Sequence, residues 1–225
     1  MRISIIVPVL DEAGGLAAAL GALQPARERG HEVIVVDGGS KDATVAIAQP
    51  LADRVIASPR GRAAQMNAGA NEARSDALLF LHADTRLPEE ADALVAGALG
   101  QHVWGRFDVR IDSSHPALAV VGFMMNLRSR WTGIATGDQA MFVRRTTFAE
   151  VGGFPALALM EDIALSSRLR KIGPPACLSE RVLTSGRRWE RGGIIATVML
   201  MWRLRFLYFL GADPQRLARD YEGGR

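Results

Sequence analysis

The chain has 225 residues, of which 48% are hydrophobic and 23% are charged, a composition that excludes disordered and fibrous proteins. Lysine plus arginine number 27 and aspartate plus glutamate 24, and the net charge of +3 is too small to indicate nucleic-acid binding. The single cysteine, Cys177, excludes an internal disulfide and fits a reducing compartment. Because no targeting segment is evident, we expect a cytoplasmic protein.

Short apolar runs alternate with helix-like segments in the first hundred residues. The predicted strands are residues 3–10, 32–36, 54–57 and 77–81, and the predicted helices are residues 14–29, 41–48 and 61–73. Strands that are apolar on both faces and separated by helices are typical of a parallel sheet covered on both sides. We therefore predict an α/β fold with a mainly parallel central sheet and helices on both of its faces.

The pattern changes after about residue 100. Residues 103–111 predict an extended edge strand or an antiparallel strand, and residues 116–131 a helix. A further strand is predicted over 139–143, and an amphipathic helix over 160–171, where apolar residues recur at helical spacing. No repeat or linker separates the two halves, so we expect them to share one core.

Aspartates follow three of the predicted N-terminal strands at or near their carboxyl ends: Asp11, Asp37 and Asp84. Ligands of open parallel sheets bind outside these strand ends, although any one aspartate could simply serve a turn or a helix cap. The glycines after Asp37, among them Gly39, permit close approach of the backbone to a ligand. Neither the dinucleotide fingerprint nor a phosphate-binding loop is present, which disfavours nicotinamide and P-loop functions.

His82 and Asp84 close the fourth predicted strand and are candidate metal ligands. A hard divalent cation such as Mn2+ or Mg2+ prefers oxygen ligands and can carry a diphosphate on its other side. Two acids one residue apart at a strand end can hold such a cation, but here His82 replaces the first acid. The site would therefore rest on Asp84, diphosphate oxygens and water. A buried structural histidine is the alternative for His82.

These residues, in this order, resemble the family 2 glycosyltransferases of the GT-A fold over roughly residues 2–190. The joint order and spacing of the segments carry the resemblance. The HADTRLP turn is most similar to a bacterial subgroup of short, soluble members associated with radical-SAM and selenium-domain proteins. The matching segments are SIIVPVLDE (4–12), VIVVDGGSKDAT (33–44), RGRAAQMNAGA (60–70), LLFLHADTRLP (78–88), GDQAMFVRRTTFAEVGGFP (137–155), EDIALSSRLRKIG (161–173) and GRRW (186–189).

The resemblance implies a donor that is a nucleotide-diphosphate sugar, commonly linked to UDP. In the family, the acid that matches Asp37 reads the base, and arginines near a helix N-terminus suit the anionic diphosphate. The GRRW segment resembles the shortened form of a family motif that closes over donor and acceptor, which implies a single sugar transfer, and a surface basic turn with a packed tryptophan is the alternative. The implied donor-binding residues are Pro8, Asp11, Asp37, Gly39, Arg60, Arg62, Arg188 and Trp189.

The resemblance also implies the catalytic residues. Asp162 matches the base that takes a proton from an acceptor hydroxyl during inverting transfer, and Glu161 is its neighbour. The last acid of the family's metal motif falls on Asp84 and the first on His82, a departure that bears on metal affinity. Both members of the 161–162 pair could instead only stabilise a helix N-terminus.

The implied organisation is one GT-A catalytic domain over residues 1–190, with a nucleotide-binding half (1–100) and an acceptor half (101–190). Residues 191–225 follow as an apolar helix and tail. We expect the acceptor to be a small molecule or a lipid-like molecule, and Arg106, Asp108 and His115 are candidates either for its contacts or for structural roles. A sugar-nucleotidyltransferase and a non-catalytic nucleotide-sugar-binding or membrane-associated protein are the alternatives.

The C-terminal segment predicts a helix over residues 194–210 that ends at Gly211 and Pro214. Arg203 and Arg205 interrupt its apolar run, so a membrane span is disfavoured. Together with Trp202 and Tyr208, these arginines suit a membrane interface. Packing on the protein's own core, a homodimer contact and a peripheral membrane contact all stay open.

Overall fold

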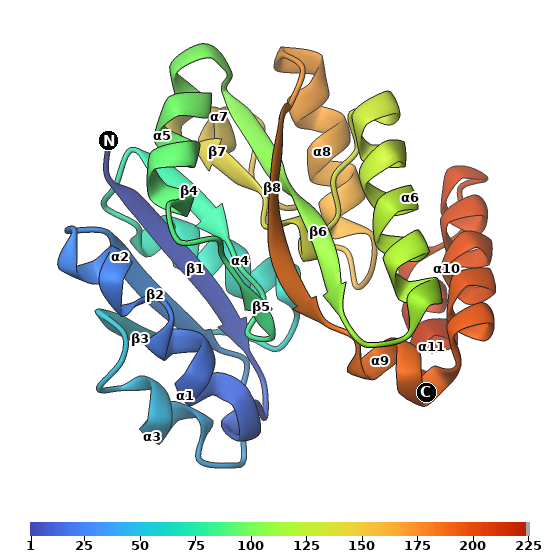
Figure 1. Cartoon of the computed structure of the whole chain (residues 1–225), viewed down its shortest axis with the longest axis horizontal. Coiled ribbons are helices and arrows are strands. Elements are labelled where there is room, and N and C mark those ends of the chain that lie inside the picture. Colours follow the sequence, from blue (N-terminus) through green and yellow to red (C-terminus); the bar gives the residue numbers. More distant parts are fainter. Residues whose placement is uncertain (224–225) are drawn as a thin grey trace.

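The computed structural model of the chain describes residues 1–223, of which Arg188, Arg191 and Glu222 are described by their backbone alone. Within these residues, one sheet of eight strands has the order β3-β2-β1-β4-β7-β6-β8-β5, and helices cover both of its faces (Figure 1). The strands are β1 (Ile3–Val9), β2 (Glu32–Asp37), β3 (Arg54–Ala57), β4 (Ala77–Phe80), β5 (Thr85–Arg86), β6 (Trp104–Asp112), β7 (Phe142–Arg144) and β8 (Ala176–Ser185). The helices are α1 (Ala13–Gly21), α2 (Gln24–Glu28), α3 (Thr44–Ala48), α4 (Arg62–Glu72), α5 (Ala91–Gln101), α6 (Pro116–Thr132), α7 (Arg145–Glu150), α8 (Glu161–Ile172), α9 (Arg187–Gly192), α10 (Ile194–Phe209) and α11 (Pro214–Gly223), and η1 (Gly137–Gln139) is a 3-10 turn.

The sheet is parallel in its first half and mixed in its second. Strand β1 pairs in parallel with β2 and β4, and β2 with β3. Strand β7 runs antiparallel to β4 and β6, while β6 and β8 pair in parallel. Both faces are buried: Ile5 and Val7 of β1 join one apolar cluster, and Ile6 joins the other. The predicted α/β fold with a mainly parallel sheet is therefore confirmed.

Several local predictions differ from the structure. Of the two alternatives predicted for residues 103–111, the antiparallel strand is confirmed by the pairing of β6 with β7. The edge position is wrong, because β6 lies inside the sheet and is buried without interruption from Trp104 to Val109. The single helix predicted over 14–29 is two helices, because Pro25 lacks an N–H and occupies the first turn of α2. The sequence patterns do not predict α5, β8 or α11.

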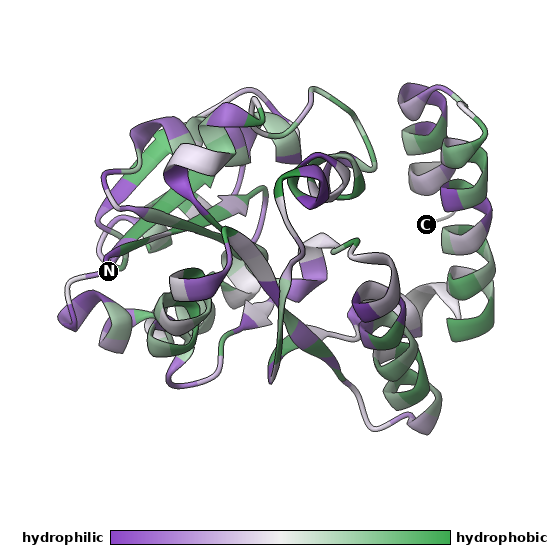
Figure 2. Cartoon of the chain, turned by 90° about the horizontal axis from the view of Figure 1, so that it is seen from above, coloured by the Kyte–Doolittle hydropathy of each residue, from purple (hydrophilic) through white to green (hydrophobic). Residues whose placement is uncertain are grey.

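The two C-terminal helices form a pair at the end of the molecule opposite the N-terminus (Figures 1 and 2). The helix predicted over 194–210 is confirmed as α10, and Gly211 follows it with φ of 86°. Leu204 of α10 and Leu217 of α11 share an apolar cluster with Met160 and Ile163 at the start of α8. The described residues contain no helix that is long and apolar enough to cross a membrane.

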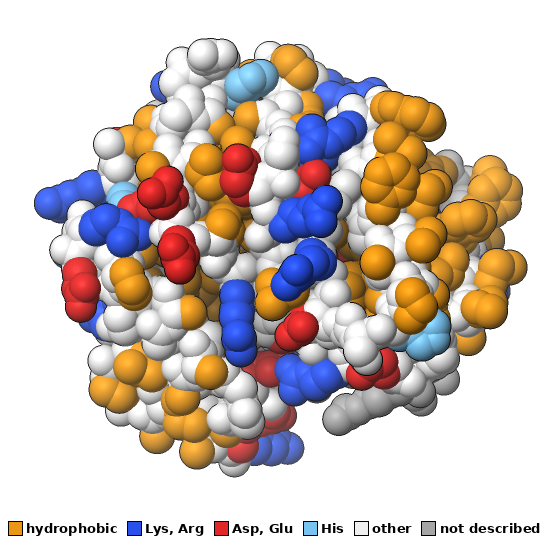
Figure 3. Space-filling view, viewed as in Figure 1, with side chains coloured by type: hydrophobic (Ala, Val, Ile, Leu, Met, Phe, Trp, Pro, Cys, Tyr) orange, Lys and Arg blue, Asp and Glu red, His pale blue; other side chains and the backbone are white. Residues whose placement is uncertain are grey.

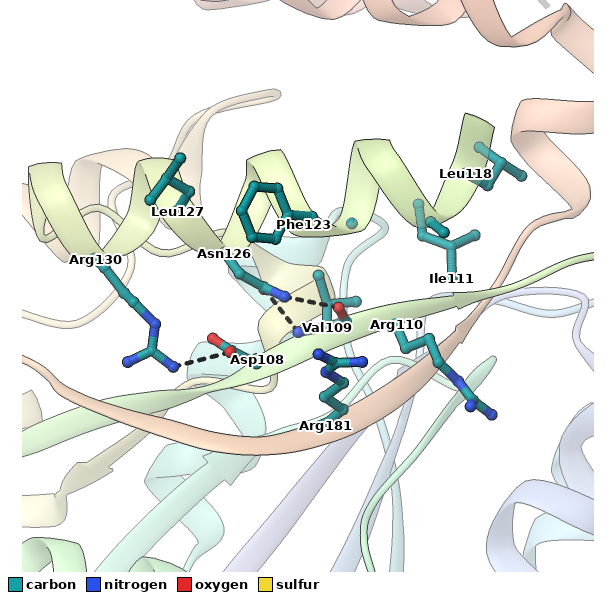
Figure 4. A pocket seen from close by; sticks show the side chains of 12 residues that line it. Asp108, Val109, Arg110, Ile111, Leu118, Phe123, Asn126, Leu127, Arg130 and Arg181 are labelled. Atoms are coloured by element: carbon teal, nitrogen blue, oxygen red, sulfur yellow. Dashed lines mark hydrogen bonds and ion pairs between the residues drawn. The ribbon is translucent and has the colours of Figure 1, made fainter. Parts of the chain in front are cut away.

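A polar network fixes α6 against β6 beside a cavity of about 240 Å³ (Figure 4). The carboxylate of Asp108 pairs with the guanidinium of Arg106, whose side chain is fully buried, and with that of Arg130 at 2.8 Å. The amide side chain of Asn126 bonds the backbone N–H and C=O of Val109 at 2.8 and 2.9 Å. Arg106 and Asp108, candidates for acceptor contact, thus pair with each other.

We expect Asp108→Ala to lower the free energy of unfolding by about 3 kcal/mol, because it leaves the buried charge of Arg106 without its partner. Asp220→Ala is the matched control, because Asp220 pairs with Arg203 on the surface and such pairs contribute about 1 kcal/mol or less. Urea unfolding of the three proteins measures both losses. Equal losses in the two variants would contradict a structural role for the buried pair.

Candidate active site

The carboxyl ends of β1 and β2 are joined by hydrogen bonds between their loops. The hydroxyl of Ser40 accepts a hydrogen bond from the backbone N–H of Asp11 at 2.9 Å and donates one to the carboxylate of Asp37 at 2.5 Å. Asp11 in turn accepts from the N–H of Lys41 at 2.7 Å. The structure therefore brings two of the three predicted aspartates together in one turn assembly.

Asp37 is buried in that assembly and accepts hydrogen bonds from the backbone N–H groups of Gly39 and Ser40. Gly39 has φ of 94° and open space where a side chain would lie, as a close backbone contact with a ligand requires. The amide of Gln65, on α4, donates to the carbonyls of both Val9 and Val36 at 2.8 Å. This bond pair holds the two strand ends at fixed separation.

The third aspartate, Asp84, is exposed after β4, the strand next to β1. Partial burial raises the pKa of Glu12, and the negative charge of Asp84 adds to this effect while Arg187 opposes it. Asp84 and Arg187 are therefore close enough to Glu12 to act on it through space. The loop after β4 and the start of α9 thus lie at the same edge of the sheet as the loop after β1.

Helix α8 begins at the two predicted catalytic acids, directly after a residue with unusual backbone geometry. Met160 has φ of 69°, a conformation that side chains other than glycine adopt at a cost. One carboxylate oxygen of Asp162 accepts a hydrogen bond from the N–H of Gly137 at 2.9 Å, and the other accepts from the N–H of Ile163 at 2.7 Å. The carboxylate is thereby held between the η1 turn and the first turn of α8.

Glu161 is 5% exposed and has a very different environment from its neighbour. Burial, with a smaller contribution from the charge of Asp162, raises the pKa of its carboxyl from the ordinary 4.5 to about 7, and Arg62 opposes this rise. The two acids of the pair are therefore inequivalent. Glu161 can carry a proton near neutral pH and donate a hydrogen bond.

A cavity of about 70 Å³ collects residues from both halves of the chain. Arg62 and His82 line it from the N-terminal half, and Glu161 and Asp162 from the start of α8. The C-terminal helices close its remaining side. The full lining is Arg62, His82, Thr136, Gly137, Asp138, Leu159, Met160, Glu161, Asp162, Ile163, Met201, Arg205 and Tyr221.

The other predicted donor-binding residues lie at the sheet edge or outside the cavity lining. Pro8 is half-buried in β1, Arg60 is exposed just before α4, and Trp189 is half-buried in α9. The side chain of Arg188 lies outside the described residues, whereas Arg187, which was not predicted, acts on Glu12. The sequence pattern assigned Arg205 to a membrane interface and not to this cavity, because nothing in an apolar helix indicates which of two neighbouring arginines turns inward.

Only part of the predicted metal site can be recognised in the geometry. The described residues contain no group of three or more His, Cys, Asp or Glu side chains placed to hold a metal ion. Asp84 offers an exposed carboxylate, and Nδ1 of His82 lies 3.5 Å from an oxygen of Asp138. These residues fit a cation that takes most of its ligands from a bound diphosphate and water.

Comparison with known sequences gives a consistent family. Residues 4–150 match the family described as glycosyl transferase family 2. A Mycobacterium bovis PGL/p-HBAD biosynthesis glycosyltransferase is 33% identical over 172 residues, which are 67% of this chain and 62% of that protein. A Pseudomonas fluorescens undecaprenyl-phosphate 4-deoxy-4-formamido-L-arabinose transferase is 32% identical over 157 residues, which are 63% of this chain and 46% of that protein. The chain thus spans less than two thirds of the length of these curated relatives.

A solved structure supports the fold. The mannosyltransferase PcManGT from Pyrobaculum calidifontis, in complex with GDP-Man and Mn2+, superimposes with a TM-score of 0.64. The match covers 81% of this chain and 56% of that one, with 21% sequence identity. The GT-A fold expected from the sequence is confirmed by this likeness.

Glu161 gives the stability a recognisable pH dependence. Between pH 4.5 and about 7 the folded protein holds a proton on Glu161 that the unfolded chain has released, so stability falls as the pH rises. Glu161→Gln removes this titrating carboxyl. We therefore expect the free energy of unfolding of the variant, minus that of the wild type, to rise by about 2–3 kcal/mol over that interval and then to level off. Urea unfolding at stepped pH measures the difference.

Glu150→Gln, at the exposed end of α7, is the matched control for this series. We expect it to follow wild type throughout. A constant difference between Glu161→Gln and wild type from pH 4.5 to 7.5 would contradict the raised pKa of Glu161.

Proposed function

Because the chain belongs to glycosyl transferase family 2, we propose that it transfers a sugar from a nucleotide-diphosphate sugar to an oxygen of an acceptor. The observation that carries the proposal is the cavity in which Glu161 and Asp162 face Arg62 and His82 at the edge of the sheet. The transferase names of the two curated relatives support it, as does the GDP-Man complex of PcManGT.

The donor would lie along the carboxyl ends of β1, β2 and β4. Asp37 would read the base, commonly uracil, from the turn that Gly39 leaves open, with Pro8 and Asp11 lining the same pocket. The diphosphate would lie towards Arg62 at the start of α4, where backbone N–H groups and a guanidinium both favour an anion. Arg60, Arg188 and Trp189 complete the proposed donor contacts.

A divalent metal, Mn2+ or Mg2+, would be held by Asp84, with His82 as the second protein ligand. When bound, it would neutralise charge on the departing diphosphate. The Mn2+ complex of PcManGT supports this part of the proposal. Arg60, Arg62 and Arg188 would act on the same anion by charge and hydrogen bonding.

Asp162 would act as the base of an inverting transfer. Its carboxylate takes the proton of the acceptor hydroxyl while that oxygen bonds to the anomeric carbon. The bond from this carbon to the diphosphate oxygen breaks on the opposite side, and its electron pair leaves with the nucleoside diphosphate. The N–H groups of Gly137 and Ile163 fix the carboxylate in position, which limits the geometric rearrangement needed.

We expect Asp162→Asn to lower turnover by about 10²- to 10⁴-fold while the affinity for the nucleoside diphosphate stays within a factor of three, because a base acts on the acceptor. Asp84→Asn is the complementary variant and should lose the response to Mn2+. Release of nucleoside diphosphate from UDP- and GDP-sugars, with Mn2+ or a chelator, measures turnover. Equilibrium titration with UDP and GDP measures the affinity.

The same assays separate the alternatives. Exchange of pyrophosphate into the nucleotide sugar would indicate a sugar-nucleotidyltransferase. Binding of a nucleotide sugar without release of nucleoside diphosphate would indicate a non-catalytic binding protein. Full turnover of Asp162→Asn would contradict the assignment of the base.

The exposed apolar side chains of α6 and α10 support a place at a membrane surface. On α10 they recur as Ile195, Met199, Trp202, Phe206 and Phe209, each at least 61% exposed, and so form one stripe. Figure 3 shows apolar side chains gathered on this side of the molecule. On α6 the corresponding residues are Val120, Phe123, Met124 and Trp131.

We propose that these two stripes contact a membrane, where tryptophan favours the interface between lipid and water. The name of the undecaprenyl-phosphate transferase supports a lipid-like acceptor for this chain. One of the two arginines predicted at the interface is placed differently, since the Nε atom of Arg205 is buried and its side chain lines the cavity. A homodimer through the same stripes is the competing arrangement.

We expect the wild type to float with vesicles that contain phosphatidylglycerol and the double variant Trp202→Glu/Phe206→Glu to stay behind, because two charges on the stripe oppose its burial in lipid. Ala17→Glu/Ala18→Glu, on the exposed face of α1, adds the same charge elsewhere and should float. A wild type that stays in solution and elutes as a dimer disrupted by the stripe variant would contradict membrane contact.

A further inference from the structure

Two arginines that the proposed mechanism does not use lie close to Asp162. Arg205 comes from α10 and lines the cavity, and Arg128 comes from α6. Burial, with a smaller contribution from the positive charge of Arg205, lowers the pKa of Arg128 to about 10, and Asp162 opposes this effect. The two arginines, which are 77 residues apart in sequence (205 minus 128), thus act on each other through space.

These guanidinium groups have hydrogen-bonding capacity that the described residues do not fill. The Nε and Nη2 atoms of Arg128 and the Nε atom of Arg205 are buried and have no hydrogen-bond partner. Asp162 and Asp138 act on both arginines through space but accept no bond from these three atoms. A buried N–H group without an acceptor costs stability, and the cost is larger for a charged group.

The pair lies on the acceptor side of the proposed base. Arg62 and His82 line the cavity from the donor-binding half, whereas Arg205 lines it from the C-terminal helices. In Figure 1, α10 lies at the far end of the molecule from β1 and β2. A group held by Arg205 and Arg128 would therefore approach Asp162 from the side opposite the donor's base.

From the unpaired guanidinium atoms and the position of Arg205 in the cavity lining, we infer that Arg128 and Arg205 form a subsite for an anionic group, a phosphate or a carboxylate, carried by the acceptor near the oxygen that receives the sugar. That the anion belongs to the sugar acceptor rests on the proposed function, whereas the anion subsite itself does not. Guanidinium groups are suited to such anions, because their planar fork donates parallel charge-assisted hydrogen bonds. An anion there would satisfy N–H groups that are otherwise unpaired.

The test uses inorganic phosphate as the probe and the full-length chain. We expect phosphate to bind the wild type, measured by calorimetric titration at constant ionic strength, and Arg205→Gln and Arg128→Gln each to weaken binding by about tenfold. Arg203→Gln is the matched control, because Arg203 lies two residues away on α10, is exposed and pairs with Asp220. It should bind phosphate as the wild type does. Arg205→Lys keeps the charge without the fork and should bind with intermediate affinity.

Titration with UDP and GDP distinguishes this subsite from the donor site. Nucleotide affinity that is unchanged in Arg205→Gln and Arg128→Gln supports an acceptor subsite, whereas a parallel loss of nucleotide affinity would overturn it and assign the arginines to the donor's diphosphate. Equal phosphate binding in all variants, or no binding to a folded wild type, would also overturn it. If phosphate binding depends on the arginines but no nucleotide binds, the proposed function fails while the anion subsite stands.

The anionic group could belong to a lipid headgroup or to a soluble phosphate ester. Glycerol 3-phosphate and dodecyl phosphate, the latter below its micellar concentration, are both phosphate monoesters. The first carries a small polar group and the second an alkyl chain like that of a lipid. Dependence of either affinity on Arg205 supports the subsite, and the ratio of the two affinities identifies the source. An affinity for both esters that Arg205→Gln leaves unchanged would overturn the proposal.

Discussion

Two backbone N–H groups, those of Gly137 and Ile163, hold the carboxylate of Asp162, and the rest of the cavity depends on this constraint. It joins the η1 turn, which precedes β7, to the first turn of α8. The left-handed conformation of Met160 directs the chain into α8 so that Glu161 is buried while Asp162 meets the turn. A substitution that breaks the hydrogen bonds of Asp162 would move Glu161 and Asp162 together, because they are adjacent on one helix.

The sheet topology explains why the η1 turn and the start of α8 lie at the carboxyl ends of the parallel strands. Strands β1, β2 and β4 are parallel, so their carboxyl ends open on one edge, and the antiparallel β7 extends the sheet beside β4. The η1 turn leads into β7 and therefore lies at this same edge, next to His82 at the end of β4: a side chain added at Gly137 would lie 2.5 Å from the His82 ring. The small residue at 137 thus lets the two halves of the site approach each other.

The sequence predicted features that depend on local periodicity or on strand ends. Alternating apolar runs predicted the parallel strands, and the aspartates after them led to the turn assembly of Asp11 and Asp37. Features that depend on distant packing were not predictable in this way. Strand β8 carries exposed charges in its middle, at Glu180 and Arg181, and so lacks a strand-like apolar pattern. The helix pattern of residues 194–210 is apolar on nearly all sides, so it could not indicate that Arg205 turns inward while Arg203 stays exposed.

The two arginines of α10 show how one helix can serve two surroundings. Positions 203 and 205 are about 200° apart around a helix of 3.6 residues per turn, so they point to nearly opposite sides. Leu204 packs in the apolar cluster with α8 and α11, and Arg205 lines the cavity. The apolar stripe lies on the face opposite Leu204, between the two arginines. Trp202 of the stripe and Arg205 are three residues apart and therefore lie on adjacent parts of the helix surface. If that stripe rests on a membrane, the same helix would bring Arg205 near the lipid surface. The membrane contact and the anion subsite would then be two consequences of the same helix orientation.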